Sequence, residues 1–396
     1  MPLMRSRVLL LALGLLAAAA AHAQSCPEPA TWSALDGERP RAAQASALLD
    51  RMAQREVVLL GEVHDDADHH RWQLQTLAAL HARRPDMAIG FEMFTRRVQP
   101  ALDRWVAGKL TVKEFLDQSE WHANWNMPAE LYLPLFEFAR INRIPLLALN
   151  IERTLSRAIT EKGWDAVPEA EREGVGRPAP PAAAYRDSLF DVYLHHPTLR
   201  DKGDKGGKGA RPKKSDAAFR FFVESQTAWD RAMAEALARR AGAGKPLVVG
   251  VMGSGHLRHG HGVPHQLRDL GVNNVGTLLP LSAGGECKDL RAGLADAVFM
   301  LPAQVAPKPA PPRLGVQLED HEGGVRILAV TAGSLAEQSG LKRGDVILEM
   351  AGRPLQKTLT VIALVRLQPA GTWLPLRIKR GEETLELVIK FPPEKS

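Results

Sequence analysis

Cysteine is scarce in this sequence, which has only Cys26 and Cys287 among its 396 residues. Two thiols so far apart cannot supply the paired C-x-x-C motifs of zinc ribbons or thioredoxin-like redox sites. Isolated thiols in an oxidising compartment usually pair with each other, so we expect one structural disulfide between Cys26 and Cys287.

Long apolar runs are also missing, except at the start of the chain. Met1–Arg7 carries two arginines, and Val8–Ala20 is apolar or small throughout. Ala21–Ala23 then fits an A-x-A cleavage site, so we expect residues 1–23 to be an export signal and the mature protein to be periplasmic. Lipid attachment at Cys26 is a less favoured alternative, because the residues before it form a poor lipobox. No later segment reaches the roughly 20 apolar residues that a membrane-spanning helix needs.

A large excess of charge of one sign is absent from most of the chain. The sequence has 51 basic and 45 acidic residues, and export would remove two of the arginines. The segment Asp201–Lys214, "DKGDKGGKGARPKK", has six basic and two acidic residues and so carries the whole of the remaining basic excess. Because the basic charge is not spread over one face of a domain, we expect no nucleic-acid partner. We expect this Lys/Gly-rich segment to be a solvated loop, with peripheral contact to anionic lipid as an alternative.

Proline is concentrated in one place, the segment Leu301–Arg313, "LPAQVAPKPAPPR". Proline has no backbone N–H and cannot continue a helix or an interior strand, so this segment should be an extended linker. We therefore expect four parts: a signal peptide at 1–23, a large domain at 24–300, a linker at 301–312 and a small domain at 313–394.

Short apolar runs alternate with helical patterns in the large domain, which predicts an α/β fold with a mostly parallel sheet flanked by helices. The expected helices include Asp68–Arg83, with Asp66 as its N-cap, and Asp216–Arg240. The expected strands are Val57–Leu60, Met87–Phe91, Ile144–Leu149, Leu247–Met252 and Val275–Leu279.

Polar side chains directly follow several of these expected strands. Glu62 and His64 come after the first strand, Glu92 after the second and His256 after the fourth. The carboxyl ends of parallel strands lie on one rim of the sheet, where α/β folds bind their ligands. Glu62 and His64 are two residues apart, so they face the same side of an extended chain. We therefore predict that these four side chains form one site.

Two imidazoles and two carboxylates suit a divalent ion such as Zn, Mn or Fe. A metal-bound water could then act as the nucleophile of a hydrolase, with Glu62 or Glu92 transferring its proton. The competing interpretation is structural, in which Glu62 and His64 cap the next helix and pair with Arg71 or Arg96. The serine-hydrolase motif G-x-S-x-G and the zincin motif H-E-x-x-H are both absent from the sequence.

The large domain also contains four long segments, "LLGEVHDDADHHRWQ", "IGFEMFTRRVQPALD", "WNMPAELYLPLFEFARINRIPLLALNI" and "VVGVMGSGHLRHGHGVP". In this order they resemble the ChaN-like haem-binding uptake domain of the Tiki superfamily, over about Val57 to Leu279. Two G-x-x-H motifs, Gly61–His64 and Gly253–His256, mark the wider superfamily together with Glu92. Other members of that superfamily resemble metal-dependent hydrolases, which keeps a divalent metal ion as the alternative cofactor.

This resemblance implies haem binding in iron acquisition, with a tyrosine as the type of iron ligand. Tyr132 lies in the matching segment near Trp121 and Trp125, which makes it a candidate residue of a haem pocket. The competing interpretation places these aromatic residues in the hydrophobic core. No C-x-x-C-H motif is present, so haem would be bound non-covalently.

The end of the chain opens with a strand at Arg313–Val316 and continues with "GSLAEQSGLKRGDVILEMAGRPL" at Gly333–Leu355. These segments resemble a small, β-rich PDZ domain of the bacterial HtrA-like type. The resemblance implies that a peptide adds a strand and places its C-terminal carboxylate on backbone N–H groups at one end of the groove. The alternative is a degenerate PDZ domain that only packs within the chain. The peptide-binding residues that the resemblance to a PDZ domain implies are Leu314, Gly315, Val316, Thr358 and Ile362.

We weigh three functions for the whole chain. The first is an exported haem-binding protein of iron acquisition, whose PDZ domain binds the C-terminal peptide of an envelope protein. The second is a metal-dependent hydrolase that uses the Glu/His site, and the third is a non-catalytic envelope adaptor. We prefer a binding protein to an enzyme.

Overall fold

Two separate β-sheets organise the chain. A computed structural model describes residues 26–37, 39–125, 127–195, 212–282, 287, 290–302 and 312–393. The predicted signal peptide lies outside these residues, as do most of the predicted linker and most of the Lys/Gly-rich segment. None of the described helices combines the length and the apolar character that crossing a bilayer requires.

Eight strands form the sheet of the large domain: β1 (Thr31–Ala34), β2 (Arg41–Ala43), β3 (Val57–Glu62), β4 (Met87–Thr95), β5 (Leu146–Asn150), β6 (Leu247–Gly253), β7 (Val275–Ser282) and β8 (Ala297–Leu301). Their order across the sheet is β2-β1-β8-β7-β3-β6-β4-β5. The strands from β8 to β5 run parallel to one another, and β1 and β2 add an antiparallel edge.

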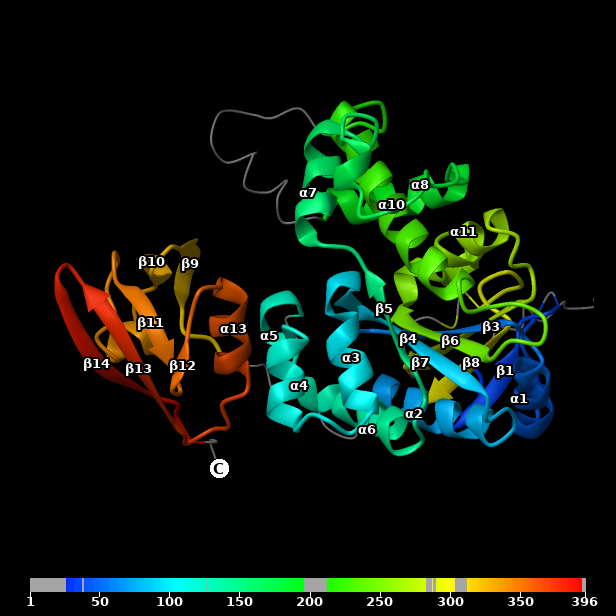
Figure 1. Cartoon of the computed structure of the whole chain (residues 1–396), viewed down its shortest axis with the longest axis horizontal. Helices are drawn as coiled ribbons and strands as arrows, with labels where there is room; N and C mark the ends of the chain where they lie inside the picture. The colour runs from blue at the N-terminus through cyan, green and yellow to red at the C-terminus, as the bar shows by residue number, and fades with distance from the viewer. Residues whose placement is uncertain are drawn as a thin grey trace, which may run out of the picture.

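Helices cover both faces of this sheet, so the large domain has three layers (Figure 1). Helices α1, α2, α3 and α6 pack on one face, and α10 and α11 pack on the other. The helices of the large domain are α1 (Ala45–Ala53), α2 (Ala67–His81), α3 (Gln99–Val106), α4 (Val112–Gln118), α5 (Trp121–Asn124), α6 (Leu133–Ile141), α7 (Arg153–Lys162), α8 (Ala183–Leu194), α10 (Ala217–Ala238) and α11 (Val263–Asp269).

The central strands are buried along their whole length, because a parallel sheet with helices on both sides has no solvent face. Every residue of β3, β4 and β6 is buried. After β3 the chain turns into α2, where the Asp66 carboxylate accepts the backbone N–H of Asp68 at 2.9 Å. This is the predicted N-cap, and it leaves Glu62 and His64 at the carboxyl rim of the sheet.

The small domain has an antiparallel sheet in the order β14-β13-β11-β10-β9, with β12 paired to β11. Helix α13 lies beside β9, and the two elements border a groove. The elements are β9 (Val316–His321), β10 (Gly324–Val330), α12 (Leu335–Gln338), β11 (Val346–Met350), β12 (Arg353–Pro354), α13 (Thr358–Arg366), β13 (Trp373–Arg380) and β14 (Glu383–Lys390).

The two domains touch where α13 packs against α5, as Figure 1 shows. The Thr360 hydroxyl of α13 donates to the backbone carbonyl of His122 in α5 at 3.5 Å. Burial lowers the pKa of His122, and the charge of Arg353 in the small domain lowers it further. The contact therefore joins one wall of the groove to a helix of the large domain.

The predicted fold class is confirmed in both domains. The five predicted strands are present, and the structure adds β1, β2 and β8. Cys26 and Cys287 form the expected disulfide, which ties the first described residue to the segment after β7. The predicted domain boundaries themselves stay a prediction.

Candidate functional site

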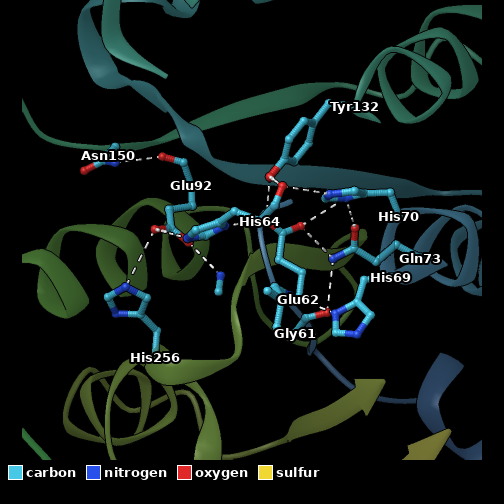
Figure 2. Close-up of polar contacts among 12 residues, drawn as sticks. Gly61, Glu62, His64, His69, His70, Gln73, Glu92, Tyr132, Asn150 and His256 are labelled. Carbon is cyan, nitrogen blue, oxygen red and sulfur yellow. Dashed lines mark hydrogen bonds and ion pairs between the residues drawn. The ribbon is translucent and has the colours of Figure 1, made fainter. Parts of the chain in front are cut away.

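The carboxyl ends of β3, β4 and β6 bring Glu62, His64, Glu92 and His256 together, as Figure 2 shows. Close packing at two glycines makes this possible. A Cβ on Gly61 would lie 2.5 Å from a methyl carbon of Leu279, so only glycine allows the end of β3 to pack this closely against Leu279 of β7. A Cβ on Gly253 would lie 3.0 Å from Cε1 of His64, so any larger residue at position 253 would crowd the His64 ring.

Glu62 is the buried centre of the first half of the site, with 2% of its surface exposed. Its carboxylate lies 2.7 Å from His64 Nδ1 and accepts the Tyr132 hydroxyl at 2.7 Å and the Gln73 amide at 3.0 Å. Burial acts to raise the pKa of Glu62, but the hydrogen bond with His64 and the charges of His70 and His64 outweigh it and lower that pKa. Glu62 is therefore a charged group that orients the His64 ring.

Glu92 lies between the two imidazoles (Figure 2). Its Oε1 is 3.6 Å from His256 Nε2 and 4.0 Å from His64 Nε2, and its Oε2 accepts the Gly253 N–H at 2.7 Å. Among the described residues Oε1 has no hydrogen-bond partner, although it is buried. An acceptor of this kind is costly to bury without a donor, so the neighbouring rings must supply positive charge.

His256 supplies that charge. Its Nδ1 lies 2.6 Å from Asp230 Oδ1, and the other oxygen of Asp230 accepts the Tyr185 hydroxyl at 2.8 Å. Burial acts to lower the pKa of His256, but Glu92 and Asp230 together raise it to about 9. His256 is therefore protonated at neutral pH and bridges two carboxylates. His64 has a raised pKa as well, since Glu62 and Glu92 outweigh the effect of burial.

Asp230 and Tyr185 belong to the site but were not predicted from the sequence. Asp230 lies on α10 and is fully buried, on a helix whose other buried positions are largely apolar or small. An acidic residue at a core position of an amphipathic helix was the available signal, because a buried carboxylate requires a partner. The partner could not be identified, since His256 is 26 residues away along the chain.

Two partly buried tryptophans flank the histidines. Trp125 makes an edge contact with His64, with ring centroids 4.8 Å apart, and Trp229 makes one with His256 at 4.9 Å. They border a cavity of about 180 Å³, which we call the tryptophan hollow. The residues that line it are Met93, Thr95, Asn124, Trp125, Asn150, Ile151, Arg153, Ser156 and Trp229.

The cap and the arginine pairs that the structural interpretation assigned to Glu62 and His64 are wrong. Asp66, not Glu62, caps α2, and Arg71 and Arg96 pair elsewhere, with Asp68 and Glu235. The metal alternative gains no support either. Among the residues that the structure describes, no group of three or more His, Cys, Asp or Glu side chains is arranged to hold a metal ion.

Neither Tyr132 nor His64 lines the tryptophan hollow, but the His64 side chain is 32% exposed and Tyr132 is not exposed. Tyr132 is fully buried among Trp121 and Phe136, and its hydroxyl donates to Glu62. Burial and the adjacent Glu62 charge raise the pKa of Tyr132 well above its usual value. A phenolate is thus disfavoured at this position, and Tyr132 serves as a hydrogen-bond donor that supports Glu62 from within the core.

The predicted peptide-binding residues of the small domain surround one groove of about 480 Å³, which includes Leu314, Gly315, Val316, Thr358 and Ile362. Gly315 has a φ of +79°, and a Cβ there would lie 2.3 Å from Cβ of Ser334. Only glycine fits this turn, which leads into β9 and closes one end of the groove.

Comparison with known proteins agrees with this architecture. Residues 48–267 match the model of the family described as haem-binding uptake, Tiki superfamily, ChaN, which is more than half of the chain. The chain belongs to this family. Residues 312–391 match the PDZ domain family, so the protein joins a ChaN-like haem-binding domain to a PDZ domain. The resemblance predicted from the sequence is confirmed on both counts.

Among solved structures, the ChaN of Campylobacter jejuni, described with cofacial haem binding, is 19% identical and has a TM-score of 0.50. The match covers 68% of this chain and 96% of that one, and it shows a shared fold. The HtrA3 PDZ domain bound to a phage-derived ligand is 22% identical over 20% of this chain and 82% of that one, with a TM-score of 0.18. The HtrA-type protease AlgW with a decapeptide is 17% identical over 22% of this chain and 30% of that one, with a TM-score of 0.20. No curated protein matches this chain.

Proposed function

We propose that this protein binds haem non-covalently beside His64, with part of the porphyrin in the tryptophan hollow that Trp125 borders, and serves iron acquisition in the periplasm. The observation that carries the proposal is the position of His64 within a domain of the haem-binding ChaN family. Its side chain is 32% exposed, it contacts Trp125, and a buried carboxylate orients it from behind. An oriented, partly exposed imidazole beside flat apolar groups is a suitable arrangement for a metalloporphyrin.

The residues around His64 fit the apolar faces of a porphyrin. Trp125 and Trp229 offer aromatic surfaces at the hollow. A contact of this kind is stabilised by burial of apolar area at about 25 cal/mol per Å². The hollow itself is smaller than the roughly 300–1,000 Å³ of enclosed ligand pockets, so it encloses only part of such a ligand.

His64 is the better candidate for the iron ligand. The resemblance implied a tyrosine, but the Tyr132 hydroxyl is occupied by Glu62 and has a raised pKa. His64 instead has its Nδ1 bound to Glu62, which leaves Nε2, 4.0 Å from Glu92 Oε1, as its donor atom once the ring is neutral. A carboxylate that is hydrogen-bonded to the other ring nitrogen also makes an imidazole a stronger metal ligand.

Absorbance titration with hemin tests the proposal. The wild-type protein should give a saturable Soret shift, and His64→Ala should lose the spectrum of an imidazole-bound iron. Tyr132→Phe should keep that spectrum, and His321→Ala, a partly exposed histidine of the PDZ domain, controls for adventitious binding. A wild-type protein without a saturable shift would exclude haem binding, and a spectrum lost only in Tyr132→Phe would return the ligand role to tyrosine.

The PDZ domain is proposed to hold the haem-binding domain near an envelope protein with a free C-terminus. Its groove, between β9 and α13, supports this role, and the disulfide supports an oxidising compartment. Cell fractionation tests the location. A peptide-array screen tests the partner, because Gly315→Trp should lose the peptides that the wild type binds. Identical binding by both forms would refute the tether.

A further inference from the structure

Arg153 occupies a distinctive position at the tryptophan hollow. It begins α7, directly after β5, and it is the only cation among the described residues that line the hollow. Its side chain is exposed, and its Nη2 donates to the backbone carbonyl of Asn124 at 2.8 Å. Across the described part of the chain no carboxylate lies within ion-pair distance of it. Most of its guanidinium is thus available to a ligand.

A free guanidinium at the edge of an apolar hollow recognises a particular ligand chemistry. Arginine presents a planar fork of N–H donors that matches the geometry of a carboxylate. Haem carries two propionate carboxylates on one edge of an otherwise apolar ring. The combination of Trp125, Trp229 and Arg153 therefore matches a flat apolar ligand with an acidic edge.

A carboxylate of the PDZ domain, Asp320, acts electrostatically on Arg153. Asp320, at the end of β9, accepts the Thr358 N–H at 2.8 Å and pairs with Lys357 at 3.1 Å. Partial burial and the neighbouring Arg157 lower the pKa of Arg153, and Asp320 opposes this shift across the domain boundary. Asp320 binds the first turn of α13, α13 packs against α5, and Arg153 donates to Asn124 at the end of α5, so both residues contact the elements that form the domain boundary.

We propose that Arg153 binds a propionate carboxylate of haem, and that Asp320 of the PDZ domain weakens this contact by competing for the same positive charge. The inference rests on the proposed function. It adds a carboxylate-binding residue and makes the haem affinity depend on the PDZ domain. Asp320 also accepts the Thr358 N–H in the first turn of α13, which borders the peptide groove. This residue therefore connects the proposed haem site to the peptide groove.

Hemin and hemin dimethyl ester, which lacks the free carboxylates, provide the test in the full-length protein. The wild type should bind hemin more tightly than the ester, and Arg153→Gln should weaken hemin binding about tenfold while leaving the ester unchanged. Asp320→Asn should strengthen hemin binding about two- to fivefold, because exposed charges interact weakly, and should also leave the ester unchanged. The side-chain oxygen of asparagine retains an acceptor for Thr358.

Two matched controls separate this contact from general electrostatics. Arg41→Gln removes an exposed arginine that pairs with Asp36 and does not line the hollow, and Glu382→Gln removes a carboxylate that is 98% exposed at the turn between β13 and β14. Both should change hemin affinity less than twofold. Equal affinity of the wild type for hemin and its ester, or weaker hemin binding by Asp320→Asn, would overturn the inference and leave haem binding intact. Failure of the wild type to bind either compound would instead remove the proposed function.

Discussion

Replacing Asp230 by asparagine removes one of the two carboxylates that hold a proton on His256. In the folded protein the pKa of His256 is raised to about 9, compared with 6.5 for a free histidine. Because the folded-state pKa lies above the unfolded one, protonation stabilises the fold fully below pH 6.5, and this stabilisation is lost as pH rises through about 9. The difference corresponds to about 3 kcal/mol, at 1.36 kcal/mol per pKa unit.

Asp230→Asn should reduce this pH dependence and not merely the stability. Burial acts to lower the pKa of His256, and Glu92 alone must then oppose it. We expect the variant to be less stable at pH 6 and to show a free energy of unfolding that falls by roughly half as much between pH 6 and pH 9.5. A residual slope is expected, because His64 also has a raised pKa and is present in both proteins.

Urea unfolding followed by tryptophan fluorescence measures this slope. Seven of the eight tryptophans precede residue 300, so the signal reports mainly on the large domain. The measurement should be made with the disulfide intact and after dialysis against EDTA. Asp187→Asn, which removes an exposed carboxylate of α8, should keep the wild-type slope. An unchanged slope in Asp230→Asn would refute the idea that Asp230 holds the His256 proton.

Three further changes test other parts of the structure. Gly253→Ala should weaken hemin binding measured by absorbance, because the new Cβ would lie 3.0 Å from His64 Cε1, and unchanged affinity would contradict the packing. Tyr132→Phe should destabilise the protein by about 1–2 kcal/mol in urea unfolding, since Glu62 loses a buried donor, and no loss of stability would count against that bond. Removing the disulfide with Cys287→Ala should lower stability by up to about 5 kcal/mol, because the bond closes a loop with a sequence separation of 261 residues, and an unchanged Tm in calorimetry would exclude that contribution.

Much of the fold was readable from local patterns. The apolar runs of β3, β4 and β6 are buried on both sides of the sheet, so they appear in the sequence as nearly unbroken hydrophobic segments. Asp66 was identifiable as an N-cap because capping depends on residues that are adjacent in sequence. β1 and β2, which have four and three residues, were too short to stand out, and β8 is an apolar run whose pairing with β7 and β1 only the fold shows.

The sequence by itself determined which residues reach the carboxyl rim of the sheet, because strand ends and two-residue alternation are local properties. Only the tertiary structure decided how they work together. Asp230 lies on a helix distant in sequence, Tyr132 is a buried donor to Glu62, and Arg153 interacts electrostatically with Asp320 of the second domain. The physical reason is that charge and hydrogen bonding act through space over a few ångströms, and the pairs that come so close depend on how the whole chain packs.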